Sequence, residues 1–138
     1  MLKVSILTAS FNCASTIRQT IESVLAQDYP DIEYWVIDGG STDETLSILK
    51  TFEGRINYIS EPDKGIYDAI NKGLERSSGD IIGMIGADDF YPSHEVISAV
   101  VKSFEQTGAL ALYCDKQYVD AVETHKIVRN WVAGPYQN

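Results

Sequence analysis

The sequence predicts an α/β fold, with a mostly parallel central sheet, helices on both faces and antiparallel strands toward the C-terminus. The first observation is an alternation of short, continuously apolar runs with segments of helical spacing, which is typical of parallel strands buried on both faces. The second is that the last two strand-like runs follow one another with no helix between them. The length of 138 residues suits one domain, so we expect residues 1–138 to form a single unit.

The first predicted strand covers residues 4–8, and the helix that follows covers residues 15–27. Pro30 ends that helix, because proline cannot continue it, and residues 33–37 form the second strand. The helix is amphipathic, with these apolar residues on one face: Ile17, Ile21, Val24 and Leu25.

Ser41 and Glu44 have the spacing of a capping box, which predicts that a helix starts there and continues to about residue 51. A third short strand is expected over residues 56–60. The next helix, residues 66–77, is expected to turn these side chains inward: Ile66, Ile70 and Leu74.

Residues 80–86 form the fourth predicted strand. Ser93 is expected to cap the helix after it, whose apolar side comprises Ile97, Val100, Val101 and Phe104. Residues 110–119 and 126–131 read as two further strands, paired in antiparallel fashion.

The net charge of −9, from 20 acidic and 11 basic residues, argues against a nucleic-acid partner, because a phosphate backbone would be repelled. A small anionic ligand stays compatible with this charge if a metal or local amide groups offset it.

Cys13 and Cys114 lie far apart without metal-ligand spacing, which favours two reduced thiols. No apolar run reaches the roughly 18 residues that span a bilayer. The N-terminus leads directly into a strand, so we expect no signal peptide. These features predict a cytoplasmic chain, with peripheral attachment at the inner membrane face as the alternative.

Polar clusters follow three of the predicted strands. Asp88 and Asp89 follow the fourth strand, Asp38 follows the second, and residues 8–12 lie at the end of the first. In open parallel sheets, ligands bind beyond the carboxyl ends of the strands. Each aspartate alone reads as a turn or cap residue, but three clusters at one edge indicate a binding site. The acidic pair is suited to Mg²⁺ or Mn²⁺, which prefer carboxylate oxygens.

Two other nucleotide-binding folds lack their motifs here. No G-x-G-x-x-G follows the first strand, and no G-x-x-x-x-G-K-[ST] occurs anywhere in the chain. A dehydrogenase or a P-loop kinase is therefore not expected.

The segments VSILTASFN, VIDGGSTDETLSIL and SEPDKGIYDAINKGLERSSGDIIGMIGADDF, in this order, resemble family 2 glycosyltransferases of the GT-A fold. The resemblance runs from residue 4 to about residue 131. Within the family, the motifs are most similar to those of bacterial enzymes that build cell-surface polysaccharide. The resemblance implies a three-layer, Rossmann-like domain that binds a nucleotide sugar and that is truncated on the side where the acceptor binds.

The resemblance also implies roles for individual residues. The expected nucleotide-binding residues are Thr8, Ala9, Ser10, Asn12, Asp38, Lys64, Gly65, Asp68 and Asp88. Asp89 is expected to be the principal metal ligand, with Asp88 contacting the metal or the ribose. Asp38 is assigned to the base; a carboxylate accepts the N3–H of uracil and equally the N1–H of guanine, so the base stays open. Ala9 and Phe11 depart from the proline and tyrosine that are frequent in the family.

By the same resemblance, the reaction is inverting transfer of a sugar from a nucleotide diphosphate, most readily a UDP-sugar, to an acceptor hydroxyl on a glycan or lipid-linked acceptor. The catalytic base is expected beyond Asn138, and Asp115 and Asp120 read as strand-end or turn residues. The alternative is a non-catalytic module that binds a nucleotide or a partner protein. Exposed apolar surface near Trp131 and Tyr136 favours self-association into a homo-oligomer.

Overall fold

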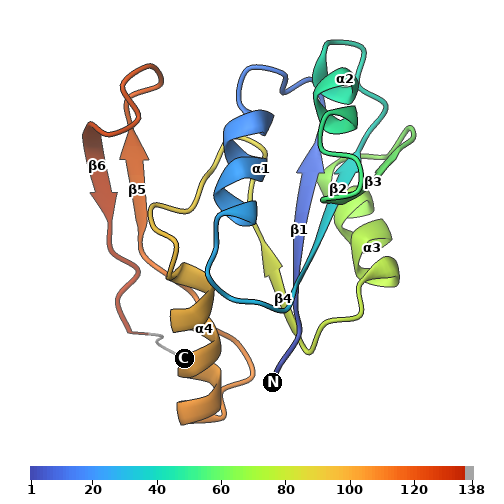
Figure 1. Ribbon diagram of the computed structural model, residues 1–138. Coiled ribbons are helices and arrows are strands. Elements are labelled where there is room, and N and C mark those ends of the chain that lie inside the picture. The colour runs from blue at the N-terminus through green and yellow to red at the C-terminus, as the bar shows by residue number, and fades with distance from the viewer. Residues whose placement is uncertain (136–138) are drawn as a thin grey trace. The chain divides into compact units, whose positions relative to one another are not determined.

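The computed structural model describes residues 1–135 and divides the chain into two compact units, residues 1–102 and 103–138. Figure 1 shows the elements in chain order. They are β1 (Val4–Ser10), α1 (Ile17–Leu25), β2 (Ile32–Asp38), α2 (Thr45–Lys50), β3 (Asn57–Ser60), α3 (Ile66–Arg76), β4 (Ile81–Met84), α4 (Val96–Thr107), β5 (Lys116–Val119) and β6 (Ile127–Trp131).

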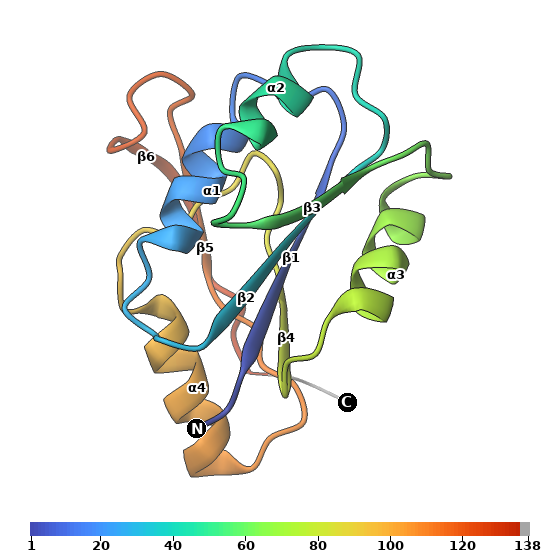
Figure 2. The same ribbon diagram turned by 45° about the vertical axis from the view of Figure 1, so that its right-hand side comes forward.

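The first unit is built on a four-stranded sheet in the order β3-β2-β1-β4, and all three strand pairs are parallel. Helix α3 lies on one face of this sheet, and α1 and α2 lie on the other (Figure 2). The α/β prediction of a parallel sheet with helices on both faces is confirmed. The chain adds β2 and β3 on one side of β1 and then places β4 on the other side, so the strand order reverses between β1 and β4.

The core of this unit lies around β1, whose residues Val4 to Thr8 are all buried. The predicted inward face of α1 is largely confirmed, because Ile17, Ile21 and Val24 are at most 1% exposed. Burying such side chains contributes about 1.5–3 kcal/mol each, so this layer supplies much of the stability of the unit.

The predicted inward face of α3 is wrong in part. Ile66 and Leu74 are 60% and 42% exposed, and the buried residues of the helix are Ala69 and Gly73. A β-carbon added to Gly73 would lie 3.2–3.3 Å from side-chain atoms of Ile37 and Leu7. The helix therefore approaches the sheet along its smallest residues, and its larger apolar residues lie beside the contact.

The capping box is a second correction. Ser41 does not cap α2, which begins at Thr45; its hydroxyl bonds to the Asp38 carboxylate instead. Strand β1 continues two residues further than predicted because Ala9 and Ser10 pair with Ile37 and Asp38. Strand β4 is shorter than predicted, and α4 begins at Val96, too far along for Ser93 to be its N-cap.

The second unit, described through residue 135, contains the end of α4 and the antiparallel pair β5–β6, as predicted. Strand β5 starts only at Lys116. Asp115 and Asp120 accept backbone N–H groups at 2.9 Å, so both are strand-end or turn residues. Trp131 is 47% exposed, and Tyr136 lies outside the described residues. Within residues 1–135, no helix has the length and apolar character needed to cross a bilayer.

At the edge of the sheet where the parallel strands begin, the carboxylate of Glu33 on β2 connects neighbouring segments. It accepts hydrogen bonds from the Ser5 hydroxyl at 2.6 Å, the Lys3 ammonium at 3.1 Å and the Ser78 backbone N–H at 2.8 Å. Burial alone would raise the pKa of Glu33, but these donors outweigh it and lower the pKa to about 2. This carboxylate therefore links β1, β2 and the loop that leads into β4.

We predict that Glu33→Gln lowers the free energy of unfolding at pH 7 by about 1.5–3 kcal/mol, the range for a hydrogen bond to a charged group. The folded-state pKa lies below the ordinary value, so the stabilisation is present above about pH 4.5 and is lost as the pH falls toward 2. Urea unfolding at several pH values should show the two proteins converging on acidification. A difference that does not change between pH 7 and pH 3 would contradict the assignment.

Candidate functional site

The carboxyl ends of all four parallel strands meet at one edge of the first unit, at the end where the β1 and β2 arrows of Figure 1 point. Ligands of open α/β sheets bind at this edge, where the strand order reverses. The reversal lies between β1 and β4. The turn after β4, which carries Asp88 and Asp89, is therefore at the position where a ligand is expected.

Asp38, the last residue of β2, is completely buried and organises this edge. Its carboxylate accepts five hydrogen bonds within the protein. The donors are the hydroxyls of Ser10, Ser41 and Ser60 and the backbone N–H groups of Gly40 and Ser41. Burial would raise the pKa of Asp38, but the hydrogen bonds from Ser41, Ser60 and Ser10 outweigh it and lower the pKa, so the group is ionised at neutral pH.

Asn12 joins the loop after β1 to the loop after β2. Its backbone adopts a positive φ of 50°, its Oδ1 accepts the Thr42 N–H at 2.9 Å, and its own N–H donates to the Ser41 hydroxyl at 2.8 Å. The neighbouring Cys13 N–H donates to the Thr45 hydroxyl at 2.9 Å. These hydrogen bonds fix the two loops to each other.

The other residues expected at the base lie within β1. Thr8 is fully buried, with its hydroxyl 3.0 Å from that of Tyr34, and Ser10 donates to Asp38. Ala9 pairs with Ile37 in the sheet and is partly exposed. Binding of a nucleotide by these residues stays a prediction, and the contacts that the structure adds are internal ones.

The loop between β3 and α3 carries the next group of expected residues. The Asp68 carboxylate accepts the Lys64 backbone N–H at 3.0 Å, and this hydrogen bond is the main cause that lowers the pKa of Asp68. Gly65 precedes the helix with a φ of 112°, which strains any L-amino acid and explains the glycine. The Lys64 side chain is exposed at the edge.

The turn after β4 holds two solvent-exposed carboxylates. A β-carbon added to Gly86 would lie 2.9 Å from Oδ2 of Asp89 and 3.1 Å from Oδ1 of Asp88, so both carboxylates reach the space above this glycine. The buried hydroxyl of Thr20 on α1 lies 3.0 Å from the Ala87 carbonyl and 2.7 Å from the Asp89 carbonyl. Helix α1 thus fixes the backbone of this acidic turn.

These two carboxylates fit a divalent cation that is shared with a ligand. Within residues 1–135, no group of three or more His, Cys, Asp or Glu side chains is placed to hold a metal ion. Mg²⁺ and similar ions often take only one or two carboxylates and complete their coordination with water and phosphate oxygens. Asp88 and Asp89 match that donor set, and Gly86 leaves room beside them.

Comparison with models of protein families shows the family of this chain. The model of Glycosyl transferase family 2 matches residues 5–137 of the chain. The chain belongs to glycosyl transferase family 2.

Relatives of this family 2 chain include an uncharacterized glycosyltransferase of Mycobacterium tuberculosis, 37% identical over 110 residues, or 78% of this chain and 42% of that protein. The chondroitin synthase of Escherichia coli is 33% identical over 121 residues, which cover 85% of this chain and 18% of the synthase. The chain thus spans less than half the length of these relatives.

Two solved structures share the GT-A fold. S. aureus TarS 1–349 in complex with UDP-GlcNAc superposes with a TM-score of 0.70 at 22% identity, over 78% of this chain and 32% of that one. The mannosyltransferase PcManGT from Pyrobaculum calidifontis, in complex with GDP-Man and Mn²⁺, gives a TM-score of 0.72 at 22% identity, over 90% of this chain and 37% of that one. The predictions of the family and of the GT-A fold are confirmed.

The structure adds residues to the edge that the sequence did not indicate. Thr20 and Ser60 contact the acidic turn and Asp38 respectively, and Asp63 lies against Gly39. A hydroxyl on the buried face of a helix, as at Thr20, is the one local signal that points to such a contact. Asp63 and Ser60 have none, because Ser60 contacts the last residue of β2 and Asp63 lies against the loop after it, both far away in the sequence.

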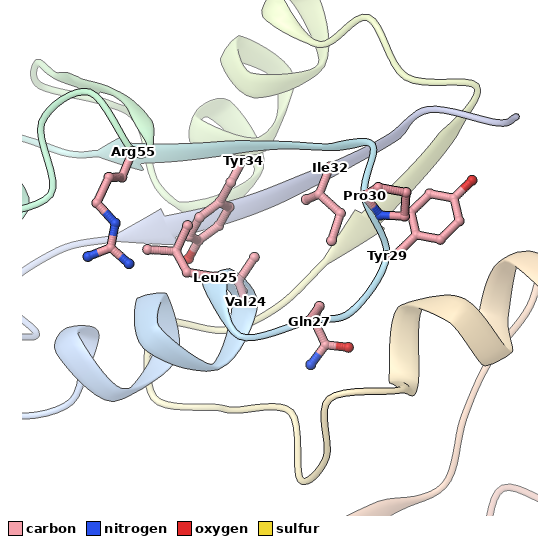
Figure 3. Close-up of a pocket in the computed structure, with 8 residues that line it drawn as sticks. All are labelled: Val24, Leu25, Gln27, Tyr29, Pro30, Ile32, Tyr34 and Arg55. Carbon is pink, nitrogen blue, oxygen red and sulfur yellow. The ribbon is translucent and has the colours of Figure 1, made fainter.

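A small pocket elsewhere in this family 2 chain contains none of the predicted site residues. It lies between the end of α1 and β2 (Figure 3). Its lining residues are Val24, Leu25, Gln27, Tyr29, Pro30, Ile32, Tyr34 and Arg55. With mainly apolar and uncharged side chains and one arginine, it offers no carboxylate for a metal.

We predict that Asp38→Ala lowers the free energy of unfolding by about 2–4 kcal/mol, because buried donors lose their acceptor at about 1–3 kcal/mol each. Asp88→Ala, an exposed carboxylate at the same edge, should change stability by less than about 0.5 kcal/mol. Urea unfolding of both variants checks this. Equal stability of the two variants would show that the five contacts of Asp38 do not support the fold.

Proposed function

We propose that the chain binds a nucleotide-diphosphate sugar at the carboxyl edge of its parallel sheet and supplies the donor site of a glycosyltransferase. The observation that carries this proposal is the position of Asp88 and Asp89, whose carboxylates reach one space above Gly86 at the reversal of strand order. Family membership supports transfer of a sugar as the chemistry of the site.

The charge of the chain makes a cation necessary for this function. A diphosphate approaching two carboxylates on a chain of net charge −9 is repelled unless positive charge lies between them. Asp88 and Asp89 would hold Mn²⁺ or Mg²⁺ there, and PcManGT, a neighbour in fold, is solved with Mn²⁺ and GDP-Man. When bound, the cation offsets the negative charge that develops on the departing diphosphate.

The proposed reaction is an inverting displacement at the anomeric carbon. The oxygen of an acceptor hydroxyl forms a bond to that carbon while the bond to the diphosphate oxygen breaks, and the electron pair leaves with the diphosphate. A carboxylate base takes the hydroxyl proton. No residue of this chain is assigned that role, because Asp115 and Asp120 are engaged with backbone N–H groups.

The donor and acceptor follow from chemistry and from the relatives. TarS is solved with UDP-GlcNAc and PcManGT with GDP-Man, so neighbours in this fold accept either base. We propose a UDP-sugar as the donor. Relatives named as chondroitin and hyaluronan synthases support a glycan acceptor in polysaccharide synthesis.

We predict that UDP binds the wild-type chain at least about tenfold more tightly with Mn²⁺ than without it, a difference of about 1.4 kcal/mol. Asp89→Asn should reduce that ratio to about one, while thermal stability stays equal or rises because a repelling charge is removed. Titration calorimetry measures the affinity for UDP, and electron paramagnetic resonance measures free Mn²⁺.

Glu95→Gln is the matched control, since it removes one exposed charge shortly after the acidic turn. It should retain the Mn²⁺ dependence of the wild type. The proposal fails if no nucleotide diphosphate binds with Mn²⁺, or if Asp89→Asn retains the full metal dependence.

A further inference from the structure

The carboxylate expected to read the base, that of Asp38, is already occupied. Its two oxygens offer about four lone-pair positions, and five donors of the protein point to them. A base that bonded to Asp38 would have to displace one of these donors from a fully buried group. If the edge binds a nucleotide as proposed above, a different residue must recognise the base.

A carboxylate with a free oxygen lies beside Gly39 and belongs to Asp63, in the loop between β3 and α3. A β-carbon added to Gly39 would lie 2.6 Å from Oδ2 of Asp63 and 3.3 Å from its Oδ1. The carboxylate therefore occupies the space that a side chain at position 39 would fill, directly after Asp38. Oδ1 accepts the Gly65 N–H at 2.8 Å, and no residue in the described part of the chain donates to Oδ2.

The loop that carries Asp63 is held in place by contacts within the protein. The Lys72 ammonium on α3 donates to the Pro62 carbonyl at 3.0 Å and pairs with Glu61 at 3.0 Å. The Glu61 N–H in turn donates to the Asp38 carbonyl at 3.0 Å. Asp63 is partly buried on this fixed loop. A preorganised acceptor loses little conformational entropy when it binds a ligand, which favours a role in recognition.

We propose that Oδ2 of Asp63 accepts the N3–H of uracil and is the specificity-determining contact of the donor site. A carboxylate only accepts hydrogen bonds, so it selects a ring nitrogen that carries a proton, as in uracil, and rejects the bare N3 of cytosine. Guanine presents two adjacent donors, which are best met by both oxygens of a carboxylate. Because Oδ1 of Asp63 is engaged with Gly65, the single free oxygen favours uracil.

The spacing of the strands is compatible with this assignment. Asp63 follows β3 and the acidic turn follows β4, at opposite ends of the order β3-β2-β1-β4. Neighbouring strands lie about 4.8 Å apart, so the two groups are separated by roughly 14 Å across the edge. A nucleoside diphosphate laid along the edge would place its base near Asp63 and its diphosphate at Asp88 and Asp89.

The test is titration calorimetry with Mn²⁺ and two ligands, UDP and its derivative methylated at N3, which has no proton to donate. The wild type should bind UDP at least about tenfold more tightly than the methylated derivative, as expected for loss of a hydrogen bond to a charged group. Asp63→Ala should bind UDP about 10–100-fold more weakly than the wild type and bind the two ligands within twofold of each other. Glu75→Ala, which removes an exposed charge from α3, should behave as the wild type.

A second variant tests the same contact by a gain of affinity for a different base. Asp63→Asn keeps the size of the side chain and adds a donor, so it should shift the preference from UDP toward CDP, whose N3 accepts. Thermal unfolding of both variants shows whether they are folded. If Asp63→Ala does not fold, Asp63→Asn and the wild-type ratio for the methylated ligand decide the outcome.

The results separate the two proposals. If the wild type binds UDP with Mn²⁺ but does not discriminate against the methylated derivative, or if Asp63→Ala retains that discrimination, the base is read elsewhere and the donor site stands. If no nucleotide diphosphate binds at all, the donor site itself is refuted, and the role of Asp63 with it.

Discussion

A buried, ionised carboxylate at the end of β2 is the constraint on which the edge of the first unit depends. Removing a charge from water is costly unless hydrogen bonds replace the lost solvation, and Asp38 obtains five of them. To supply these donors, the ends of β1 and β3 and the turn after β2 must all converge on one point. The arrangement of the loops is therefore set by the requirements of one side chain, before any ligand is considered.

The aspartates of this edge divide according to their surroundings. Asp38 is enclosed and saturated with donors, so it serves the fold. Asp88 and Asp89 face solvent and share the space above Gly86, so a positive partner bound there would relieve their mutual repulsion. Asp63 is intermediate, with one oxygen engaged and one open. Aspartates at one edge of the sheet thus have three roles. One is a structural hydrogen-bond acceptor, two form a candidate metal site, and one is a candidate group for recognition of the base.

Much of the fold could be predicted from local patterns, and so could the convergence of the polar clusters on one edge of the sheet, but the contacts among the residues of that edge could not. The parallel strands are short, continuously apolar runs and the helices repeat apolar residues at a period of 3.6, so the existence and type of each element follow from the sequence. The hydrogen bond of Ser41 does not follow from the sequence, because the S-x-x-E pattern carries no information about a buried carboxylate three residues earlier that accepts the hydroxyl. The inward face of α3 depends on how closely Gly73 approaches β1 and β2, which periodicity does not define. The place of the Asp63 carboxylate could not be predicted either, because it depends on the missing side chain of Gly39, in the loop after β2 and far from Asp63 in the sequence.

The order of the strands has a consequence for how the edge forms during folding. Strands β1 and β2 pair residues 28 positions apart, as in Val4 with Ile32, whereas β1 and β4 pair residues 77 positions apart, as in Val4 with Ile81. Closing the longer loop costs about 0.9 kcal/mol more in chain entropy, and long-range pairing is slow to form. We expect the hydrogen bonds around Asp38 to form when β1 pairs with β2. The acidic turn should reach its place later, when β4 pairs with β1. A nascent chain would therefore complete the candidate cation site, Asp88 and Asp89, only when the parallel sheet of the first unit is complete.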